Sequence, residues 1–211
     1  MRAHRLTLAW SATLAAAAAG TALARSRWLR WGATDDDLAA VLPGDELIAH
    51  PDLVATRAVT IAAPPEQVWP WVVQMGQGRG GLYSYDALEN LVGCDMHSAD
   101  RVLPEFQQLA VGDEFRLHPD MGLQVALVEP GQALVLSGGV PMGEAAPPYD
   151  FSWAFVLRGT SGGRTRLLVR ERYGYTRWWS PLLVEPVEMV SWLMSQRMLR
   201  GIRDRAERTA A

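Results

Sequence analysis

The chain has 211 residues, 49% of them hydrophobic, which is enough to fill the core of a domain of ordinary size. Its formal net charge is only -3 and its acidic and basic residues are interspersed, so we expect no nucleic-acid partner. The single cysteine, Cys94, excludes an internal disulfide, and the scattered histidines provide no ligand cluster, so we predict neither a metal site nor a cofactor.

The N-terminus carries an apolar run. Residues 6–24 are uncharged and follow Arg2 and Arg5, while Arg25, Arg27 and Arg30 come directly after the run. The run approaches the roughly 20 residues that span a bilayer, and basic residues tend to stay cytoplasmic. We predict that residues 1–30 form a membrane anchor with the domain on the cytoplasmic side. The alternative is a secretory signal cleaved near Ala24.

Residues 31–53 contain acidic, proline and glycine positions without sustained periodicity. We predict a connector here, and packing of this connector on the domain surface stays open. The folded domain is expected over residues 54–208.

The first elements of the domain are a strand and two short helices. Residues 54–61 alternate as a strand, and Pro64 and Pro65 end it. A short helix follows, bent at Pro70, and Ser84 is expected to cap a second helix that ends near Gly93. The apolar positions predicted to form the buried faces of these helices are Val68, Trp69, Val72 and Val73 in the first and Leu88, Leu91 and Val92 in the second.

From about residue 113 the apolar period becomes two, which predicts short antiparallel strands. The clearest hairpin joins residues 151–157 to residues 165–175 through a glycine-containing turn. A long helix then extends to Arg208, with Pro186 expected near its start. The predicted fold is α+β: a curved antiparallel sheet, two short helices and one long C-terminal helix across a sheet face, preceded by the N-terminal hydrophobic helix.

Arginines alternate with apolar residues along the last predicted strand. Arg170 and Arg172 share one face, while Glu171 shares the other with Val169 and Tyr173. We expect the arginine face to be solvated. If it is buried instead, each guanidinium needs a carboxylate partner, such as Asp86 or Asp100, or an anionic ligand.

Residues 60–72 (TIAAPPEQVWPWV) resemble the opening strand and helix of the START-like, or SRPBCC, superfamily, which includes polyketide cyclases and the birch-pollen-allergen type. Residues 75–86 (MGQGRGGLYSYD) and 97–101 (HSADR) are similar to a bacterial branch of it that has an N-terminal apolar segment. The resemblance covers roughly residues 54–208. It implies a helix-grip fold with a deep apolar cavity between the sheet and the C-terminal helix.

The glycine-rich loop at residues 76–81 follows a helix and lacks a Walker lysine, so it does not fit a nucleotide-binding loop. We interpret it as a tight turn that brings tyrosines and a carboxylate to a cavity rim. The leading hypothesis is a membrane-tethered domain that binds a lipid or polyketide-like molecule. Its predicted ligand-binding residues are Trp71, Tyr83, Tyr85, Asp86, Trp153, Phe155 and Met194.

Two alternatives stay open. The first is a cyclase or dehydratase type of enzyme, in which His97 or Asp86 acts as general base and Arg101 or Tyr85 stabilises developing negative charge. The second is a ligand-free interaction domain. An enzyme is the less favoured reading, because a loop held by local hydrogen bonds explains the polar residues around His97 equally simply.

Overall fold

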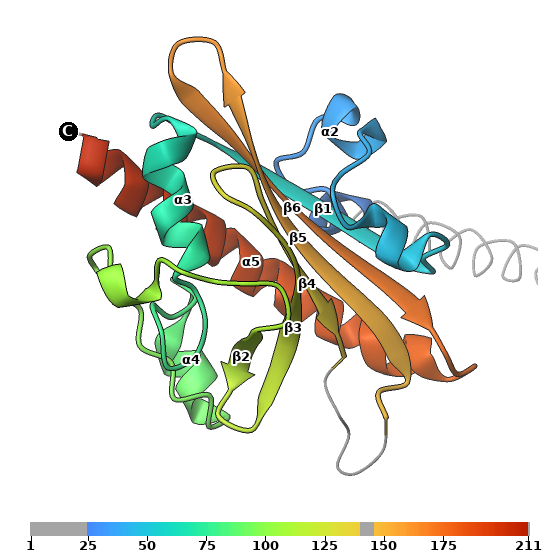
Figure 1. Ribbon diagram of the computed structural model, residues 1–211. Coiled ribbons are helices and arrows are strands. Elements are labelled where there is room, and N and C mark those ends of the chain that lie inside the picture. The colour runs from blue at the N-terminus through green and yellow to red at the C-terminus, as the bar shows by residue number, and fades with distance from the viewer. Residues whose placement is uncertain (1–24, 140–145, 211) are drawn as a thin grey trace, which may run out of the picture.

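The computed structural model describes residues 25–139 and 146–210, so the predicted apolar anchor at residues 6–24 lies outside the described residues. Six antiparallel strands form one sheet in the order β1-β6-β5-β4-β3-β2 (Figure 1). The strands are β1 (Leu53–Ile61), β2 (Glu114–His118), β3 (Met121–Glu129), β4 (Ala133–Gly138), β5 (Tyr149–Thr160) and β6 (Arg164–Tyr175). The helical elements are α2 (Asp35–Ala39), η1 (Asp45–Ile48), α3 (Pro65–Val73), α4 (Asp86–Leu91), η2 (Pro104–Phe106) and α5 (Ser180–Ala210).

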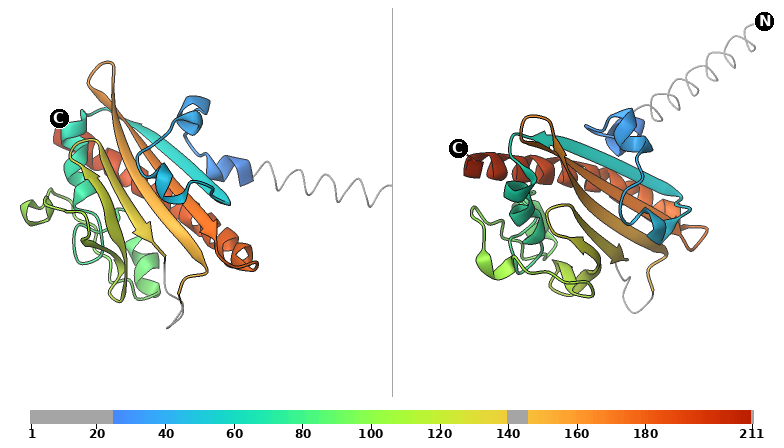
Figure 2. Two further views of the ribbon diagram at one scale, coloured as in Figure 1. Left: turned by 45° about the vertical axis from the view of Figure 1, so that its right-hand side comes forward. Right: turned by 45° about the horizontal axis from the view of Figure 1, so that its top comes forward.

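The long helix α5 runs across one face of the sheet, as Figures 1 and 2 show. The predicted α+β class, the antiparallel sheet and the long C-terminal helix are therefore confirmed. The predicted hairpin is the β5–β6 pair, in which Trp153 lies opposite Glu171. Because β1 pairs with β6, the first and the last strand in the sequence lie side by side.

The main core lies between α5, α3 and the sheet, where apolar residues from all of these elements are buried. The helix approaches the chain closely at Gly201. A Cβ built there would lie 2.4 Å from the backbone oxygen of Tyr83, far inside van der Waals contact. This position lets α5 lie directly on the loop that precedes α4.

The opposite face of the sheet is covered by residues 31–48, including α2 and η1 (Figure 2). Leu42 is buried there against a second apolar cluster that includes Val135 and Leu168. The region expected to be a connector is thus a structural layer of the domain, and its first helix begins with a capping box between Thr34 and Asp37.

The expectation that the arginine face of β6 is solvated is wrong. Arg170 is only 3% exposed, pairs with Asp45 at 2.7 Å and donates to the carbonyl oxygens of Asp37 and Ala40. Arg172 also pairs with Asp45, at 3.1 Å. Short helices leave several backbone carbonyls without hydrogen-bond partners inside the helix. The buried guanidinium groups donate hydrogen bonds to these carbonyls and also pair with one carboxylate.

The predicted cap of α4 is wrong, and Pro186 lies further inside the last helix than expected. Ser84 does not cap α4, because its hydroxyl donates to the carbonyl of Met194 on α5. Pro186 lies inside α5, which already begins at Ser180. The Ser180 hydroxyl stabilises this earlier start, since it accepts from the N–H of Arg177 and donates to the carbonyl of Pro148.

The predicted buried face of α4 is also wrong. Leu88, Leu91 and Val92 are exposed at 49%, 81% and 73%, whereas Glu89 is buried at 7% exposure. A helix of six residues is too short for periodicity to define its buried face, and its orientation follows from the loops that hold it.

Among the described residues, we find no helix with both the length and the apolar character needed to cross a membrane.

Candidate functional site

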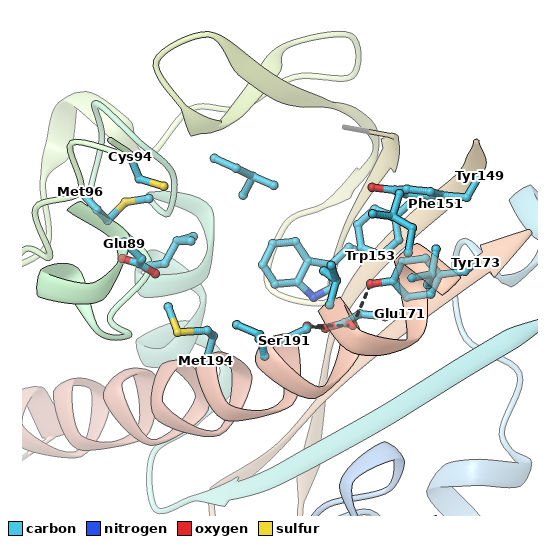
Figure 3. Close-up of a pocket in the computed structure, with 16 residues that line it drawn as sticks. Glu89, Cys94, Met96, Tyr149, Phe151, Trp153, Glu171, Tyr173, Ser191 and Met194 are labelled. Atoms are coloured by element: carbon cyan, nitrogen blue, oxygen red, sulfur yellow. Dashed lines mark hydrogen bonds between the residues drawn. The ribbon is translucent and has the colours of Figure 1, made fainter. Parts of the chain in front are cut away.

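A pocket of about 500 Å³ opens between the sheet, α5 and α4 (Figure 3). One wall consists of aromatic side chains from β5 and β6, and α5 forms another with Val184, Val187, Val190 and Met194. The facing side comes from α4 and the loop after it, which contribute Glu89, Cys94 and Met96. The pocket thus lies where the resemblance to helix-grip domains implies a cavity.

The aromatic wall follows from the alternation of β5. Tyr149, Phe151 and Trp153 are spaced by two residues and therefore project from the same sheet face. The ring centroid of Phe151 lies 4.7 Å from that of Tyr173 on the neighbouring strand, and that of Trp153 lies 6.4 Å from that of Phe115. The packed rings hold this wall in place.

A buried charge cluster lies beneath the aromatic wall. Arg57 of β1 is fully buried and pairs with Glu171 at 2.9 Å and with Glu188 of α5. Burial raises the pKa of Glu188 to about 7. Glu171 also lines the pocket, and it accepts hydrogen bonds from Ser191 at 2.9 Å and, more weakly, from the Tyr173 hydroxyl at 3.4 Å. This end of the pocket therefore carries a carboxylate whose position is held by several partners.

Glu89 is the second carboxyl group in the pocket, and it is held differently. It is 7% exposed, and its Oε2 is buried without a hydrogen-bond partner among the described residues. Burial, with a smaller effect of Asp86, raises the pKa of Glu89 to about 7. Figure 3 shows Glu89 across the pocket from Glu171, close to Met194. A carboxyl group in this state can donate or accept a hydrogen bond near neutral pH.

Two further polar groups line the pocket. The Nε1 of Trp153 is buried and has no hydrogen-bond partner within the described ranges. The Cys94 thiol is half-buried, and burial with the nearby Glu89 raises its pKa, which favours the neutral thiol. Glu89 and Trp153 therefore add two unpaired polar atoms to a mostly apolar lining, and both atoms are buried behind the pocket surface.

Of the seven predicted ligand-binding residues, Trp153 and Met194 line this pocket. Trp71, Tyr83 and Phe155 lie in the core beside it, with exposures of 2%, 1% and 0%. Tyr83 accepts a hydrogen bond from Gln74 at 2.8 Å, and burial raises the pKa of its hydroxyl.

The polar candidates lie outside the pocket lining. Asp86 accepts hydrogen bonds from the backbone N–H and the hydroxyl of Ser98, at 2.7 and 2.6 Å, and thereby holds the loop. The His97 side chain is 80% exposed and lies 3.1 Å from Asp95. Tyr85 is 36% exposed, and Arg101 is also exposed. The structure does not bring these residues together around the pocket.

The glycine-rich loop has a structural role. Gly76 and Gly81 pair with each other through backbone hydrogen bonds of 3.0 Å. A Cβ at Gly81, which has φ 74°, would lie 2.7 Å from the backbone oxygen of His97. The loop therefore packs tightly on residues 97–98.

The sequence reasoning missed Glu89, Glu171 and Ser191 as pocket residues. The signal for Glu171 was present, since it shares the apolar face of its strand with Val169 and Tyr173. Glu89 had no comparable signal. Within the described part of the chain, no three histidine, cysteine or acidic side chains converge as a metal site.

Neither a family model nor a curated protein matches the chain. Several solved structures resemble it at low identity. A protein from Mesorhizobium loti is 20% identical over 73% of this chain and 98% of its own, with a TM-score of 0.43. A hypothetical protein from Helicobacter pylori is 14% identical over 80% and 96%, with a TM-score of 0.48. The Zhui aromatase/cyclase from a Streptomyces species is 15% identical over 75% and 96%, with a TM-score of 0.43. At these values the similarities assign no function to the chain.

Proposed function

We propose that the domain binds a hydrophobic small molecule, a lipid or a polyketide-like compound, in the pocket between the sheet and α5, and that residues 6–24 tether it to a membrane. The observation that carries the binding proposal is the pocket itself, with about 500 Å³ of space and a predominantly apolar lining. Ligand sites typically have volumes of roughly 300–1,000 Å³, apolar walls and a few orienting polar groups.

The polar groups narrow the class of ligand. An unsatisfied buried polar atom costs about 1–3 kcal/mol, and the pocket has one on Glu89 and one on Trp153. Both atoms are buried behind the pocket surface, so a ligand would reach them only after the two side chains rotate. A ligand oxygen that accepts from the indole N–H and a hydroxyl or carbonyl that pairs with Glu89 would then remove both costs. The proposed ligand is therefore an apolar molecule that carries at least two oxygen functions.

The second candidate function is proton-transfer catalysis of the cyclase or dehydratase type. Its support is the pKa of about 7 for Glu89, which suits a general acid or base near neutral pH. In this pocket the proton would be carried by Glu89, because His97 and Asp86 are absent from the lining.

Native mass spectrometry of the full chain, purified from its host, tests the binding proposal. We expect an added small mass on the wild-type protein. Met194→Trp fills the pocket and should remove this mass. Met189 lies on the same helix and is 52% exposed, so Met189→Trp should retain the mass. If the wild-type chain carries no added mass and also fails to bind anilinonaphthalene sulfonate in the pocket, the ligand-free interaction domain becomes the better description.

Glu89→Gln separates binding from catalysis. If the protein only binds, the variant keeps an added mass and the bound molecule is chemically unchanged. If Glu89 transfers a proton, the variant should accumulate a precursor that differs from the molecule carried by the wild type. Since cyclisation without loss of water leaves the mass unchanged, the extracted molecules are also compared by fragmentation, and identical molecules in both proteins would contradict catalysis through Glu89.

A further inference from the structure

The first half of α5 exposes an apolar outward face. Leu182, Met189 and Leu193 are 76%, 52% and 43% exposed, and their spacings of seven and four residues place them along one side of the helix. Scattered exposed apolar residues are ordinary, but a contiguous apolar surface marks an interaction site. We call these three residues the α5 stripe.

One flank of the α5 stripe meets the start of the described chain. Glu185 pairs with Arg25 at 2.9 Å, and the Trp192 ring centroid lies 6.5 Å from that of Trp28. Residues 25–29 are helical and lie against this flank. The uncharged residues 6–24 therefore join the domain directly beside the stripe.

The other flank of the α5 stripe is the pocket mouth. Val187 and Val190 line the pocket and are nevertheless 53% and 57% exposed, so they form its rim. The rim is thus apolar along α5.

Basic residues continue the same outward side of the helix. Arg197 and Arg200 are exposed and follow Leu193 by four and seven residues, which places them in line with the stripe. Exposed Arg27 adds a charge near the start of the described chain. Juxtamembrane arginines are attracted to anionic lipids by about 1 kcal/mol each.

From this arrangement we propose that the α5 stripe rests on an anionic bilayer, the one in which residues 6–24 are anchored, so that the pocket mouth opens onto lipid. The proposal rests on the proposed membrane tether and adds an orientation and an entry route for the ligand. The apolar side chains of the stripe would enter the interface while the arginines contact headgroups. The partner is a lipid surface, and a second copy of the chain is the competing occupant.

Site-specific labelling of the full chain tests the orientation. In a Cys94→Ser background, Leu182→Cys or Leu193→Cys carries an environment-sensitive fluorophore, and Val41→Cys is the matched control. Val41 is an 85% exposed apolar residue in the layer on the far side of the sheet. The chain is reconstituted in vesicles of phosphatidylcholine and phosphatidylglycerol that contain lipids with a nitroxide high on the acyl chain.

We expect blue-shifted emission and strong quenching by the nitroxide lipid at both stripe positions, and neither effect at Val41. Replacing phosphatidylglycerol with phosphatidylcholine, or changing Arg197→Gln, should weaken the quenching severalfold. A blue shift that depends on protein density and is not accompanied by quenching from the nitroxide lipid would mean that the stripe contacts a second copy of the chain. Equal, weak quenching at all three positions, or failure of the chain to float with the vesicles, would also overturn the proposal.

Native mass spectrometry of the unlabelled wild-type chain, in which the pocket residue Cys94 is unchanged, keeps this outcome separate from the binding proposal. A quenched stripe with no ligand in the pocket contradicts only ligand binding. A retained ligand with an unquenched stripe contradicts only the docking orientation.

Discussion

Two glutamates with different surroundings define the polar character of the pocket. Glu171 has an arginine, two serines and a tyrosine as partners, so its carboxylate is largely compensated. Glu89 has no side-chain partner for its buried Oε2 among the described residues. The two residues are therefore expected to respond differently to pH and to a bound ligand.

Glu89→Gln should stabilise the protein increasingly as pH rises. The pKa of Glu89 is about 7 in the folded protein, against an ordinary value of 4.5, so the folded state binds this proton more tightly than the unfolded state. Protonated Glu89 makes its full contribution to the free energy of unfolding below pH 4.5, and this contribution is lost as pH rises through about 7. Glutamine stays neutral, so the variant should gain about 1–3 kcal/mol over wild type between about pH 5 and pH 8.

Urea denaturation across this pH range measures the difference. Glu105→Gln, at an exposed position on η2, is the matched control and should leave the pH profile unchanged. A constant difference between Glu89→Gln and wild type at all pH values would show that Glu89 does not bind its proton more tightly in the folded state.

The helix α5 connects the core, the charge cluster and the pocket, because it crosses one face of the sheet (Figure 2). Its C-terminal half packs into the main core through Met198, Leu199 and Ile202. Its N-terminal half carries the pocket wall and the exposed stripe. The close approach at Gly201 therefore sets how α5 lies on the loop before α4.

Gly201→Ala should destabilise the fold by about 1–3 kcal/mol, the usual cost of overpacking. The new Cβ would lie 2.4 Å from the Tyr83 backbone oxygen, and a backbone atom cannot move as easily as a side-chain end. Alanine would ordinarily stabilise a helix relative to glycine, so the sign itself is informative. Thermal denaturation measures the effect.

The matched control is Gly159→Ala on β5. Its Cβ would meet nothing closer than 3.7 Å, so we expect a small effect of either sign. A Gly201→Ala variant at least as stable as wild type would mean that the helix and the loop separate without cost.

At the scale of the whole molecule, the sheet has a different cover on each face. One face holds α5 and the pocket, and the other is covered by the layer of residues 31–48. Asp45 joins this layer to the sheet, because its carboxylate pairs with both Arg170 and Arg172 and accepts from the N–H of Leu42. Removing it leaves buried guanidinium groups without their carboxylate.

Asp45→Asn should therefore cost about 3–5 kcal/mol, the magnitude typical for breaking a buried ion pair. Asp35→Asn is the matched control in the same layer, since Asp35 pairs with Arg30 while its side chain is 95% exposed. Its loss should cost about 0–1 kcal/mol. Chemical denaturation of the two variants measures both losses of stability. If residues 31–48 are only loosely attached to the sheet, both losses would be small.

The amino-acid sequence by itself determined the α+β class and, from residue 54 onwards, the order of the strands and of the helices α3, α4 and α5. The alternating pattern of residues 151–157 and 165–175 and the length of the last helix are local properties, and a period of two or 3.6 can be read from neighbouring residues. The membrane anchor at residues 6–24 is likewise a sequence prediction, and it stays one.

Only the tertiary structure decided which polar residues face the pocket. Glu89 and Asp86 are one helical turn apart, yet the first is buried in the pocket and the second holds a loop. Arg170 is buried because residues 31–48 cover its strand face, a contact across more than 120 residues of sequence. Burial and pairing depend on which distant residues pack against a side chain, and local periodicity does not identify those residues.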